Sequence, residues 1–435
     1  MPIQSIEINS LFALEWVAIL ASFLAFKGPE LTLRSRITLA VFLTALSGCL
    51  LWYSICTYKI SGTNPTGLGD FSAGFFPESQ VLNGHARYLA SDPSGAADYY
   101  KKAILAEPSL IDAWIGLVRV QIVNENRQEA HKTLDIIAPA IDSISTWKWQ
   151  ELLFAYDLHD GLYFEKCFNF ILSYLPHHIK EAGWLSSRFW GGWEEVVPHV
   201  SSFNYPVFLT VLIDSKQPDA ALSLFKIMEK EGSRWEERDQ LLFCDFLISN
   251  GRFKEAKSIW HLWRKNDIAL IHDGGFEAEP LNMAFGWRFE TGPGFILERE
   301  TRPACSGNSC LHVHFNGVGN ISSNLVWQIV PVSPGTAYTL RFVRKGGNLT
   351  TDRGVFLTVS GYKNEFKTIS EQVLGDSPWQ EDKIEFSVPA GCEAIVLRVR
   401  RDESLKMDNK ISGDYWLDSV KLGLRTEDKG QRTKD

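Results

Sequence analysis

The sequence changes its periodicity near Asp267, and this change constrains the fold more than any other feature. Before it, from about residue 81, apolar residues recur every three or four positions, which is typical of amphipathic helices. After it, alternating runs such as "AYTLRFVRK", "GVFLTVSGY" and "EAIVLRVRR" are separated by Gly, Pro and Asn, which is typical of strands. A chain of 435 residues is also too long for one ordinary domain. The sequence therefore predicts a multidomain protein, helical over 81–266 and an all-β sandwich over 267–424.

One segment of the helical region has small and aromatic residues at the spacing of paired antiparallel helices. These positions are Ala96, Tyr100, Ala103, Pro108, Trp114, Leu117, Ala130 and Leu134. They resemble the tetratricopeptide repeat (TPR), in which small residues let two helices approach and a proline ends the second helix. Four or five such pairs fit between Val81 and Lys265, although the later ones are degenerate. The resemblance implies a TPR-like solenoid whose curved surface holds a protein partner; a helical spacer is the alternative.

The β region has five landmarks in a fixed order, from Ile268 to Leu424. They are "GGFEAEP", "CSGNSCLHVHF", "VWQIVPVSPGTAYTLRFVRK", "WQEDKIEFSVP" and "DYWLDSVKL". In this order they resemble the jelly-roll carbohydrate-binding modules that accompany xylanases and cellulases, within the galactose-binding-like class. The whole chain then resembles a bacterial membrane-anchored TPR protein with a carbohydrate-binding-like C-terminal domain. The resemblance implies a jelly roll that contacts a polysaccharide or another glycan.

Sugar binding needs exposed aromatic rings that stack on pyranose rings, with polar side chains beside them for the hydroxyl groups. The candidates are Trp327, Gln328, Arg341, Tyr362 and Trp416. Each aromatic candidate has a role in the core as its alternative. In "AYTLRFVRK", the alternation places Tyr338, Leu340 and Phe342 on one face of the strand and Arg341 on the other.

The same resemblance implies a structural calcium ion that ties the N- and C-terminal strands together. The matching carboxylates are Glu277 and Asp418, with Asp273 nearby and the backbone of Ser306 and Gly307 beside them. Calcium takes six to eight oxygen ligands, and carboxylates with backbone carbonyls can supply them. The alternative is that Glu277 and Asp418 only accept hydrogen bonds.

Two further pairs of residues in the β region have the spacing of a chemical site. Cys305 and Cys310 bracket the short turn "CSGNSC" and can close a small disulfide in an oxidising compartment; two thiols are the alternative. His312 and His314 alternate along "LHVHF" and share a face, as two metal ligands on one strand do. No third ligand is apparent from the sequence, so an ordinary polar face is the favoured interpretation of the histidines.

The N-terminal 60 residues are predicted to be a membrane anchor. The 21 residues from Ile37 to Thr57 carry no charge, and a helix of this length crosses a hydrocarbon core of about 30 Å. Residues 8–26 are a weaker second span. The basic residues of the intervening link (Lys27, Arg34 and Arg36) place it in the cytoplasm. The chain after about residue 59, beginning with a linker at 61–80, is then periplasmic, anchored in the bacterial inner membrane. Residues 425–435 form a charged tail that is predicted to be disordered.

Charge and motifs narrow the function. The net charge is −8 and no cluster of Lys and Arg occurs, which argues against nucleic acid as a partner. No nucleophile elbow, phosphate-binding loop or zinc-helix motif is present, so no enzymatic activity is expected. The sequence predicts a non-catalytic, membrane-anchored scaffold that joins a protein partner to a glycan, in exopolysaccharide or envelope-glycan export or assembly. The alternative is a protein adaptor whose jelly roll no longer binds sugar.

Overall fold

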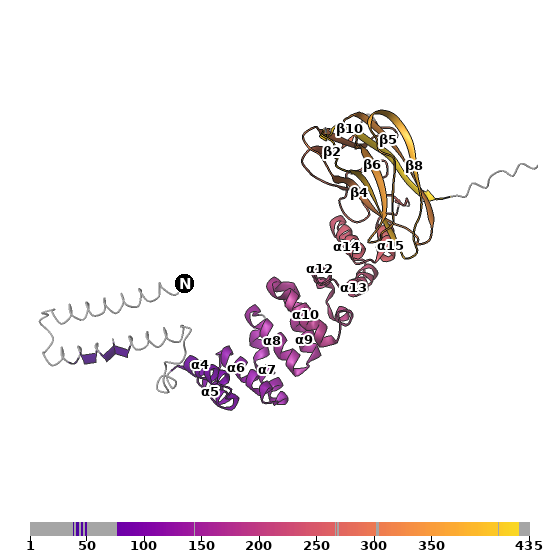
Figure 1. Cartoon of the computed structure of the whole chain (residues 1–435). Coiled ribbons are helices and arrows are strands. Elements are labelled where there is room, and N and C mark those ends of the chain that lie inside the picture. Colours follow the sequence, from indigo (N-terminus) through magenta and orange to yellow (C-terminus); the bar gives the residue numbers. More distant parts are fainter. Residues whose placement is uncertain are drawn as a thin grey trace, which may run out of the picture. The chain divides into compact units, whose positions relative to one another are not determined.

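The computed structural model describes residues 76–425, apart from 143, 266, 268, 302–303 and 408, together with isolated positions between 38 and 49. Helices come first along the chain and two β-sheets follow (Figure 1). The predicted order of a helical part and a later all-β part is therefore confirmed. The chain divides into two compact units, Met1–Phe208 and Leu209–Asp435, and the boundary falls within helix α12 (Tyr205–Asp214).

The prediction of N-terminal transmembrane helices, and with it the inner-membrane location, is corrected. Within the described part of the chain, no helix has both the length and the apolar character that crossing a bilayer requires. The predicted spans at 8–26 and 37–57 lie outside the described residues, except for isolated positions from Thr38 to Cys49. The predicted linker at 61–80 is described only from residue 76, and the predicted tail begins at the last described residue.

The first unit consists of helices in which consecutive members pack on one another. They are α4 (Pro77–Leu89), α5 (Pro93–Ala106), α6 (Ile111–Val123), α7 (Arg127–Ile141), α8 (Ser145–Leu158), α9 (Gly161–Tyr174), α10 (Ile179–Trp190) and α11 (Trp193–Val196), with the 3-10 turns η2 (Pro176–His178), η3 (Val197–His199) and η4 (Ser202–Asn204). Tyr100 of α5 is 1% exposed, and its ring lies against Gly84 of α4 and Gly116 of α6. Because these two glycines have no side chain, α4, α5 and α6 can all pack against the Tyr100 ring.

A buried ion pair of α8 accepts a hydrogen bond from α9. Lys148 and Glu151 are 1% and 0% exposed, and the Lys148 Nζ lies 3.0 Å from the Glu151 Oε2. The Tyr163 hydroxyl of α9 donates to the same oxygen at 2.5 Å. Burial, together with the nearby Glu151 carboxylate, raises the pKa of the Cys167 thiol to about 12. This polar group sits inside the helical core with its charge compensated, as a buried ion pair requires.

The second unit combines helices α13 (Pro218–Lys230), α14 (Glu237–Ser249) and α15 (Phe253–Trp263) with a two-sheet sandwich. One sheet has the strand order β1-β4-β9-β6-β7 and the other the order β2-β3-β10-β5-β8, with antiparallel pairing throughout the described strands. The strands are β1 (Arg288–Phe289), β2 (Phe295–Glu300), β3 (Cys310–Asn316), β4 (Ser323–Pro331), β5 (Ala337–Leu349), β6 (Val355–Gly361), β7 (Lys367–Ile369), β8 (Gly375–Ser387), β9 (Ala394–Arg401) and β10 (Ser412–Leu424). For convenience we call them the β4 sheet and the β3 sheet.

The core of the sandwich lies between the two sheets and follows the predicted alternation. On β5, Tyr338, Leu340 and Phe342 are buried in this core, and Arg341 is exposed on the other face. Leu397 on β9 is buried in the same core from the opposite sheet. Every second residue of each strand therefore faces outward, and these outward positions form the two surfaces on which a site can lie.

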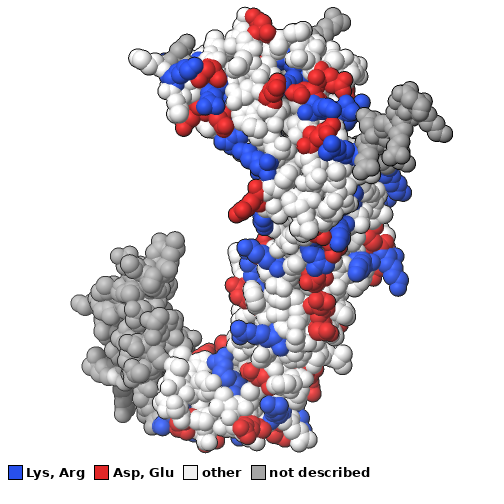
Figure 2. All heavy atoms as spheres, turned by 45° about the vertical axis from the view of Figure 1, so that its right-hand side comes forward, with Lys and Arg blue, Asp and Glu red and all other residues white. Residues whose placement is uncertain are grey.

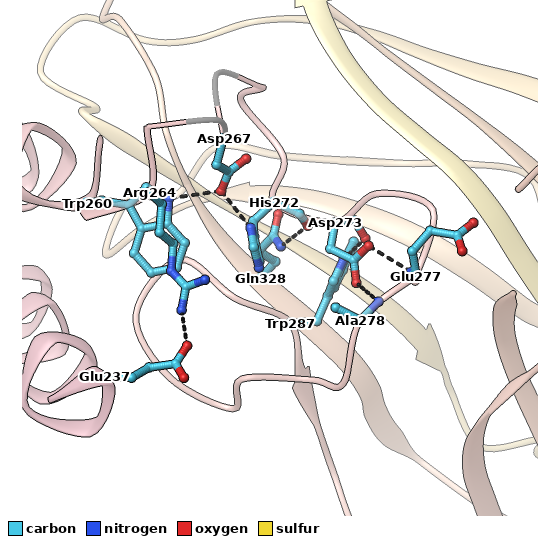
Figure 3. Close-up of polar contacts among 10 residues, drawn as sticks. All are labelled: Glu237, Trp260, Arg264, Asp267, His272, Asp273, Glu277, Ala278, Trp287 and Gln328. Carbon is cyan, nitrogen blue, oxygen red and sulfur yellow. Dashed lines mark hydrogen bonds and ion pairs between the residues drawn. The ribbon is translucent and has the colours of Figure 1, made fainter. Parts of the chain in front are cut away.

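The segment where the periodicity changes is tied both to α15 and to the sandwich (Figure 3). The Trp260 indole of α15 donates to Asp267 Oδ2 at 3.0 Å, and His272 Nδ1 lies 2.6 Å from the same oxygen. Gln328 of β4 donates its side-chain amide to the His272 carbonyl at 2.9 Å. Burial raises the pKa of Asp267, but the hydrogen bonds from His272 and Trp260 outweigh it and the net pKa is lowered. This carboxylate thus anchors the connection between helix and strand.

Candidate functional site

The outward face of the β4 sheet carries an open pocket of about 450 Å³ where the end of α14 meets the strands, which we call the Trp327 groove. Its walls are contributed by α14, β1, β4, β6, β9 and the turn after β6. The lining residues are Asp245, Ile248, Ser249, Arg288, Trp327, Ile329, Gly361, Tyr362, Lys363, Val396 and Arg398. Aromatic, basic and apolar side chains therefore converge on one surface.

The register of four strands explains why these side chains meet. Trp327 on β4 stands opposite Arg288 on β1 and opposite Arg398 on β9. Arg398 in turn stands opposite Thr358 on β6. Residues that are directly opposite in antiparallel strands point to the same face of the sheet. One row across the outer face therefore reads Arg288, Trp327, Arg398, Thr358.

Trp327 is held in place from its edge and over its ring. The indole Nε1 donates to Glu290 Oε1 at 2.7 Å, and the guanidinium carbon of Arg288 lies 4.5 Å from the ring centroid. Arg288 itself is fixed by Asp245 of α14 at 2.5 Å and by the Ala284 carbonyl at 2.9 Å. Burial lowers the pKa of Arg288. The ring is thus fixed in position with Arg288 over one face, so a sugar would stack on the other face.

Arg398 brings a positive charge to the groove without a carboxylate partner among the described residues. Its guanidinium donates to the Ser360 hydroxyl at 2.6 Å. Burial, and secondarily the neighbouring Arg400, lowers the pKa of Arg398. Arg398 and Arg400 also line an adjoining pocket of about 250 Å³, with Asn324, Thr358, Ser360 and Lys367. A half-buried guanidinium such as that of Arg398, with a second arginine beside it, is destabilised unless an anion or water approaches it.

The positive charge of this face is local. Figure 2 shows Lys and Arg side chains interspersed with Asp and Glu over the visible face of the molecule, and the net charge of the chain is −8. Arg400 is paired with Asp402 at 2.5 Å, whereas the side chain that Arg398 contacts within the described part of the chain is the Ser360 hydroxyl. Any preference for an anion therefore comes from the groove itself, and not from the field of the whole chain.

Helices α14 and α15 close one side of the groove. The ring of Tyr362 meets Phe253 of α15 edge to face, with centroids 5.2 Å apart. Lys363 donates to the Ser249 carbonyl at the end of α14 at 3.3 Å. Tyr362 therefore has one contact with a helix and one with the groove, and only part of its ring is available to a ligand.

The five residues predicted to bind sugar do not form one site. Trp327 and Tyr362 share the Trp327 groove. Gln328 is wrong as a surface contact: it is 0% exposed on the inner face and bonded to the His272 carbonyl, because neighbours along a strand point to opposite faces. Arg341 and Trp416 lie on the β3 sheet, where Arg341 is 3.6 Å from Glu381. Trp416 there borders a separate pocket of about 390 Å³ beside Gly347.

The carboxylates predicted to bind calcium are occupied by N–H donors. Asp418 is 0% exposed, and its Oδ2 accepts the backbone N–H groups of Cys305 and Ser306 at 2.9 and 2.8 Å. Glu277 accepts the Asn308 N–H at 2.9 Å, and Asp273 accepts two backbone N–H groups of its own turn (Figure 3). N–H groups aimed at a carboxylate satisfy it as a cation would, so this geometry favours the hydrogen-bonding alternative. Calcium binding itself stays a prediction, which melting curves with calcium and with a chelator would check.

The structure has no disulfide between Cys305 and Cys310, and the crosslink, which depends on an oxidising compartment, stays a prediction. Cys305 lies exposed in the turn, whereas Cys310 is buried at the first residue of β3. Burial raises the pKa of the Cys310 thiol to about 12. The two side chains thus occupy different environments on either side of a loop whose N–H groups are directed at Asp418 and Glu277.

Sequence reasoning missed Arg288 and Arg398 as residues of the groove. The signal for Arg398 was present, because the alternation of "EAIVLRVRR" places Arg398 and Arg400 together opposite the buried Leu397 and Val399. For Arg288 no such signal exists, since β1 has only two residues. Its place in the groove depends on pairing with β4, which the sequence alone does not give.

The sequence matches no known protein family and no curated protein. Among solved structures, the chain is similar to a family 16 carbohydrate-binding module, with 17% identity over 35% of this chain and 99% of the other, and a TM-score of 0.26. It is also similar to the CBM22-1 xylan-binding domain of Paenibacillus barcinonensis Xyn10C (15% identity, 35% and 91% coverage, TM-score 0.25). A third is TmCBM61 in complex with β-1,4-galactotriose (17% identity, 36% and 99% coverage, TM-score 0.26). The C-terminal all-β region thus resembles carbohydrate-binding modules, at a level that says nothing about its ligand.

Proposed function

We propose that this chain binds a glycan in the Trp327 groove and does not transform it. The observation that carries the proposal is the row across the β4 sheet in which Trp327 lies between Arg288 and Arg398 in an open pocket. A fixed indole ring offers the flat apolar surface that the C–H face of a pyranose covers. Hydroxyl and guanidinium groups beside it can hold the sugar's oxygens.

The basic residues of the groove support a glycan that carries carboxylate, sulfate or phosphate groups. Arg398 points its charge into the groove and has no ion pair within the described chain, and Arg400 and Lys367 line the continuation of the same face. A guanidinium binds planar anions with two parallel hydrogen bonds, which adds both energy and orientation. A uronic acid next to a stacked sugar ring satisfies both features at once.

The wider role is that of a scaffold. The helical unit, with its consecutive packed helices, is the part we assign to a protein partner, in the manner of TPR-like solenoids. The β-sandwich then presents the glycan to that partner. We infer export or assembly of an exopolysaccharide as the setting, because such a pairing of functions is useful there; no single residue supports it.

A protein adaptor that binds no sugar is the second candidate, and one observation favours it. Helices α14 and α15 already occupy one side of the β4 sheet through the contact of Phe253 with Tyr362 and the ion pair of Asp245 with Arg288. If this side is the functional surface, the groove serves only to seat the helices. Replacing Trp327 distinguishes the two candidates. A sugar-binding groove loses its affinity for the glycan, whereas a groove that only packs helices has no such affinity to lose.

A glycan array probed with the full chain tests the proposal. It should include neutral oligosaccharides and uronate-containing or sulfated ones at matched length. We expect saturable binding to the acidic set, its loss with Trp327→Ala, and a selective loss for acidic glycans with Arg398→Gln. Trp184→Ala, which removes a half-exposed indole on α10, is the matched control and should bind like the unmodified chain. A folded chain that binds none of the glycans would favour the adaptor.

A further inference from the structure

The outward face of the β3 sheet brings together two histidines and an aspartate, which we call the His312 cluster: His312, His314 and Asp414. The three side chains each offer one ligand atom, and these atoms lie within 4.8 Å of one another. Asp414 Oδ1 is 2.9 Å from His312 Nε2 and 2.8 Å from His314 Nδ1. Two imidazole nitrogens and one carboxylate oxygen are a donor set that zinc and similar ions take in proteins.

Strand register supplies the third member. His312 and His314 alternate along β3 and share its outer face, while Leu311, Val313 and Phe315 fill the core. Asp414 on β10 stands directly opposite His314. The cluster therefore rests on two adjacent strands of a paired sheet, where side-chain positions are fixed better than on loops.

A second layer of carboxylates orients His312. Glu298, opposite His312 on β2, lies with Oε1 3.0 Å from His312 Nδ1, and Glu300 Oε2 lies 3.3 Å from the same nitrogen. A histidine that binds a metal commonly donates its other N–H to a carboxylate, which fixes its tautomer and orientation. With Nδ1–H directed at Glu298, the lone pair of Nε2 faces Asp414.

Trp416 holds the same ring from its flat side. The indole stacks on His312 with centroids 5.0 Å apart and planes 8° apart, and its Nε1 donates to Glu300 at 2.7 Å. His312 is 11% exposed, whereas His314 and Asp414 are 45% and 28% exposed. The His312 side of the cluster is thus packed and largely buried, and the His314 side is open to solvent.

A neutral His312 ring has one N–H for two carboxylate neighbours, Glu298 at Nδ1 and Asp414 at Nε2. Ionised carboxylates only accept hydrogen bonds, so neutral His312 cannot satisfy Glu298 and Asp414 at once. Either a second proton on the ring or a metal ion completes the contact with Asp414.

We propose that the His312 cluster binds a divalent transition-metal ion, zinc foremost, through His312 Nε2, His314 Nδ1 and Asp414 Oδ1. Three protein ligands leave a fourth position for water or for an oxygen of a ligand on the open side. Bonds of about 2.0–2.1 Å in tetrahedral geometry separate ligand atoms by about 3.3 Å, so Asp414 has to withdraw by about half an ångström from each nitrogen. The site lies on the sheet opposite the Trp327 groove and does not depend on the proposed glycan binding.

Zinc titration of the full chain, freed of metal and kept reduced, tests the assignment. Competition with a chromophoric chelator should give one zinc ion per chain. His314→Ala, at the most exposed ligand, and Asp414→Asn, nearly identical in shape, should each weaken zinc binding at least tenfold. Glu298→Gln should weaken it about 10- to 100-fold as an outer-layer change. His177→Ala, which removes an exposed histidine of η2 far from the cluster in sequence, is the matched control and should leave affinity unchanged.

Cobalt distinguishes this site from adventitious binding to cysteine. Co²⁺ replacing zinc should give visible d–d bands without a thiolate charge-transfer band, and His314→Ala should abolish those bands while the circular dichroism of the chain stays the same. The proposal is overturned if zinc does not bind with a one-to-one stoichiometry. It is overturned equally if the His314 and Asp414 variants bind zinc as tightly as the unmodified chain, or if the cobalt spectrum has the thiolate band.

Discussion

At the scale of single residues, Asp418 links two distant segments of the sandwich by hydrogen bonds; we call this contact the Asp418 clamp. It belongs to β10, yet its carboxylate accepts the N–H groups of Cys305 and Ser306 more than a hundred positions earlier. The side chain is fully buried. Buried carboxylates are retained in folded proteins when donors surround them, because an unpaired one is costly. Removing the acceptor leaves those N–H groups without a partner.

We therefore expect Asp418→Ala to destabilise the second unit by about 3 kcal/mol, since buried donors lose a charged acceptor. For a unit of this size that lowers the Tm by about 6–12 °C. Calorimetry of the full chain measures it, with the transition of the first unit as an internal reference. Glu277→Ala removes an exposed acceptor of one N–H group and should cost about 1 kcal/mol or less. Equal losses for the two variants would contradict the clamp.

The residues that sequence reasoning placed well, and those it did not, differ in what fixes them. Trp327 faces outward as its position in an alternating strand requires, and Arg341 does so too. The same alternation excludes Gln328 from the surface, because the direct neighbour of an outward-facing Trp327 must point inward. Asp414 is different: only the pairing of β3 with β10 brings it to His314, and no local pattern in the sequence contains that register.

At the scale of elements, glycines determine how closely helices of the first unit can pack. A Cβ on Gly116 of α6 would lie 2.5 Å from the Tyr100 ring, and one on Gly84 of α4 would meet the same ring at 2.5 Å. Helix propensity alone disfavours both glycines, since Gly is about 1 kcal/mol worse than Ala in a helix interior. Close packing of three helices on one buried ring outweighs that preference.

Gly116→Ala should consequently destabilise the first unit by about 2 kcal/mol, because the strain of an overpacked core exceeds the gain in helix propensity. Gly161→Ala at the start of α9 is the matched control: a Cβ there meets no atom within 4 Å, so the change should leave stability unchanged or slightly higher. The two Tm shifts in the calorimetric transition of the first unit give the comparison. A stabilising Gly116→Ala would mean that Tyr100 does not fill the space between α4 and α6.

Element type followed from periodicity, because a helix and a strand bury different sets of positions along the same sequence. Ala96 and Ala103 of α5 and Leu134 of α7 are buried, as helical periodicity predicts, and β5 buries the predicted face. Strand order did not follow. The neighbours β4, β9 and β6 come from separate parts of the chain, and alternation is equally satisfied by other orders.

At the scale of the whole molecule, function depends on which outer face of the sandwich is used. The β4 sheet carries the Trp327 groove with an arginine that has no carboxylate partner among the described residues, and the β3 sheet carries Trp416 stacked on His312. The two indoles look equivalent in sequence. They differ in surroundings: Arg288 and Arg398 flank Trp327, whereas Trp416 stacks on His312, donates to Glu300 and has the Lys345 ammonium over its ring.

The most direct measurement is calorimetric titration of the full chain with an acidic oligosaccharide selected on the array, repeated with Trp327→Ala and with Trp416→Ala. Loss of stacking and of a positioned ring at the β4 sheet should weaken binding at least tenfold, which corresponds to about 1.4 kcal/mol. The Trp416 variant should bind as the unmodified chain does. Binding that survives Trp327→Ala but is lost with Trp416→Ala would contradict the account and move the glycan site to the β3 sheet.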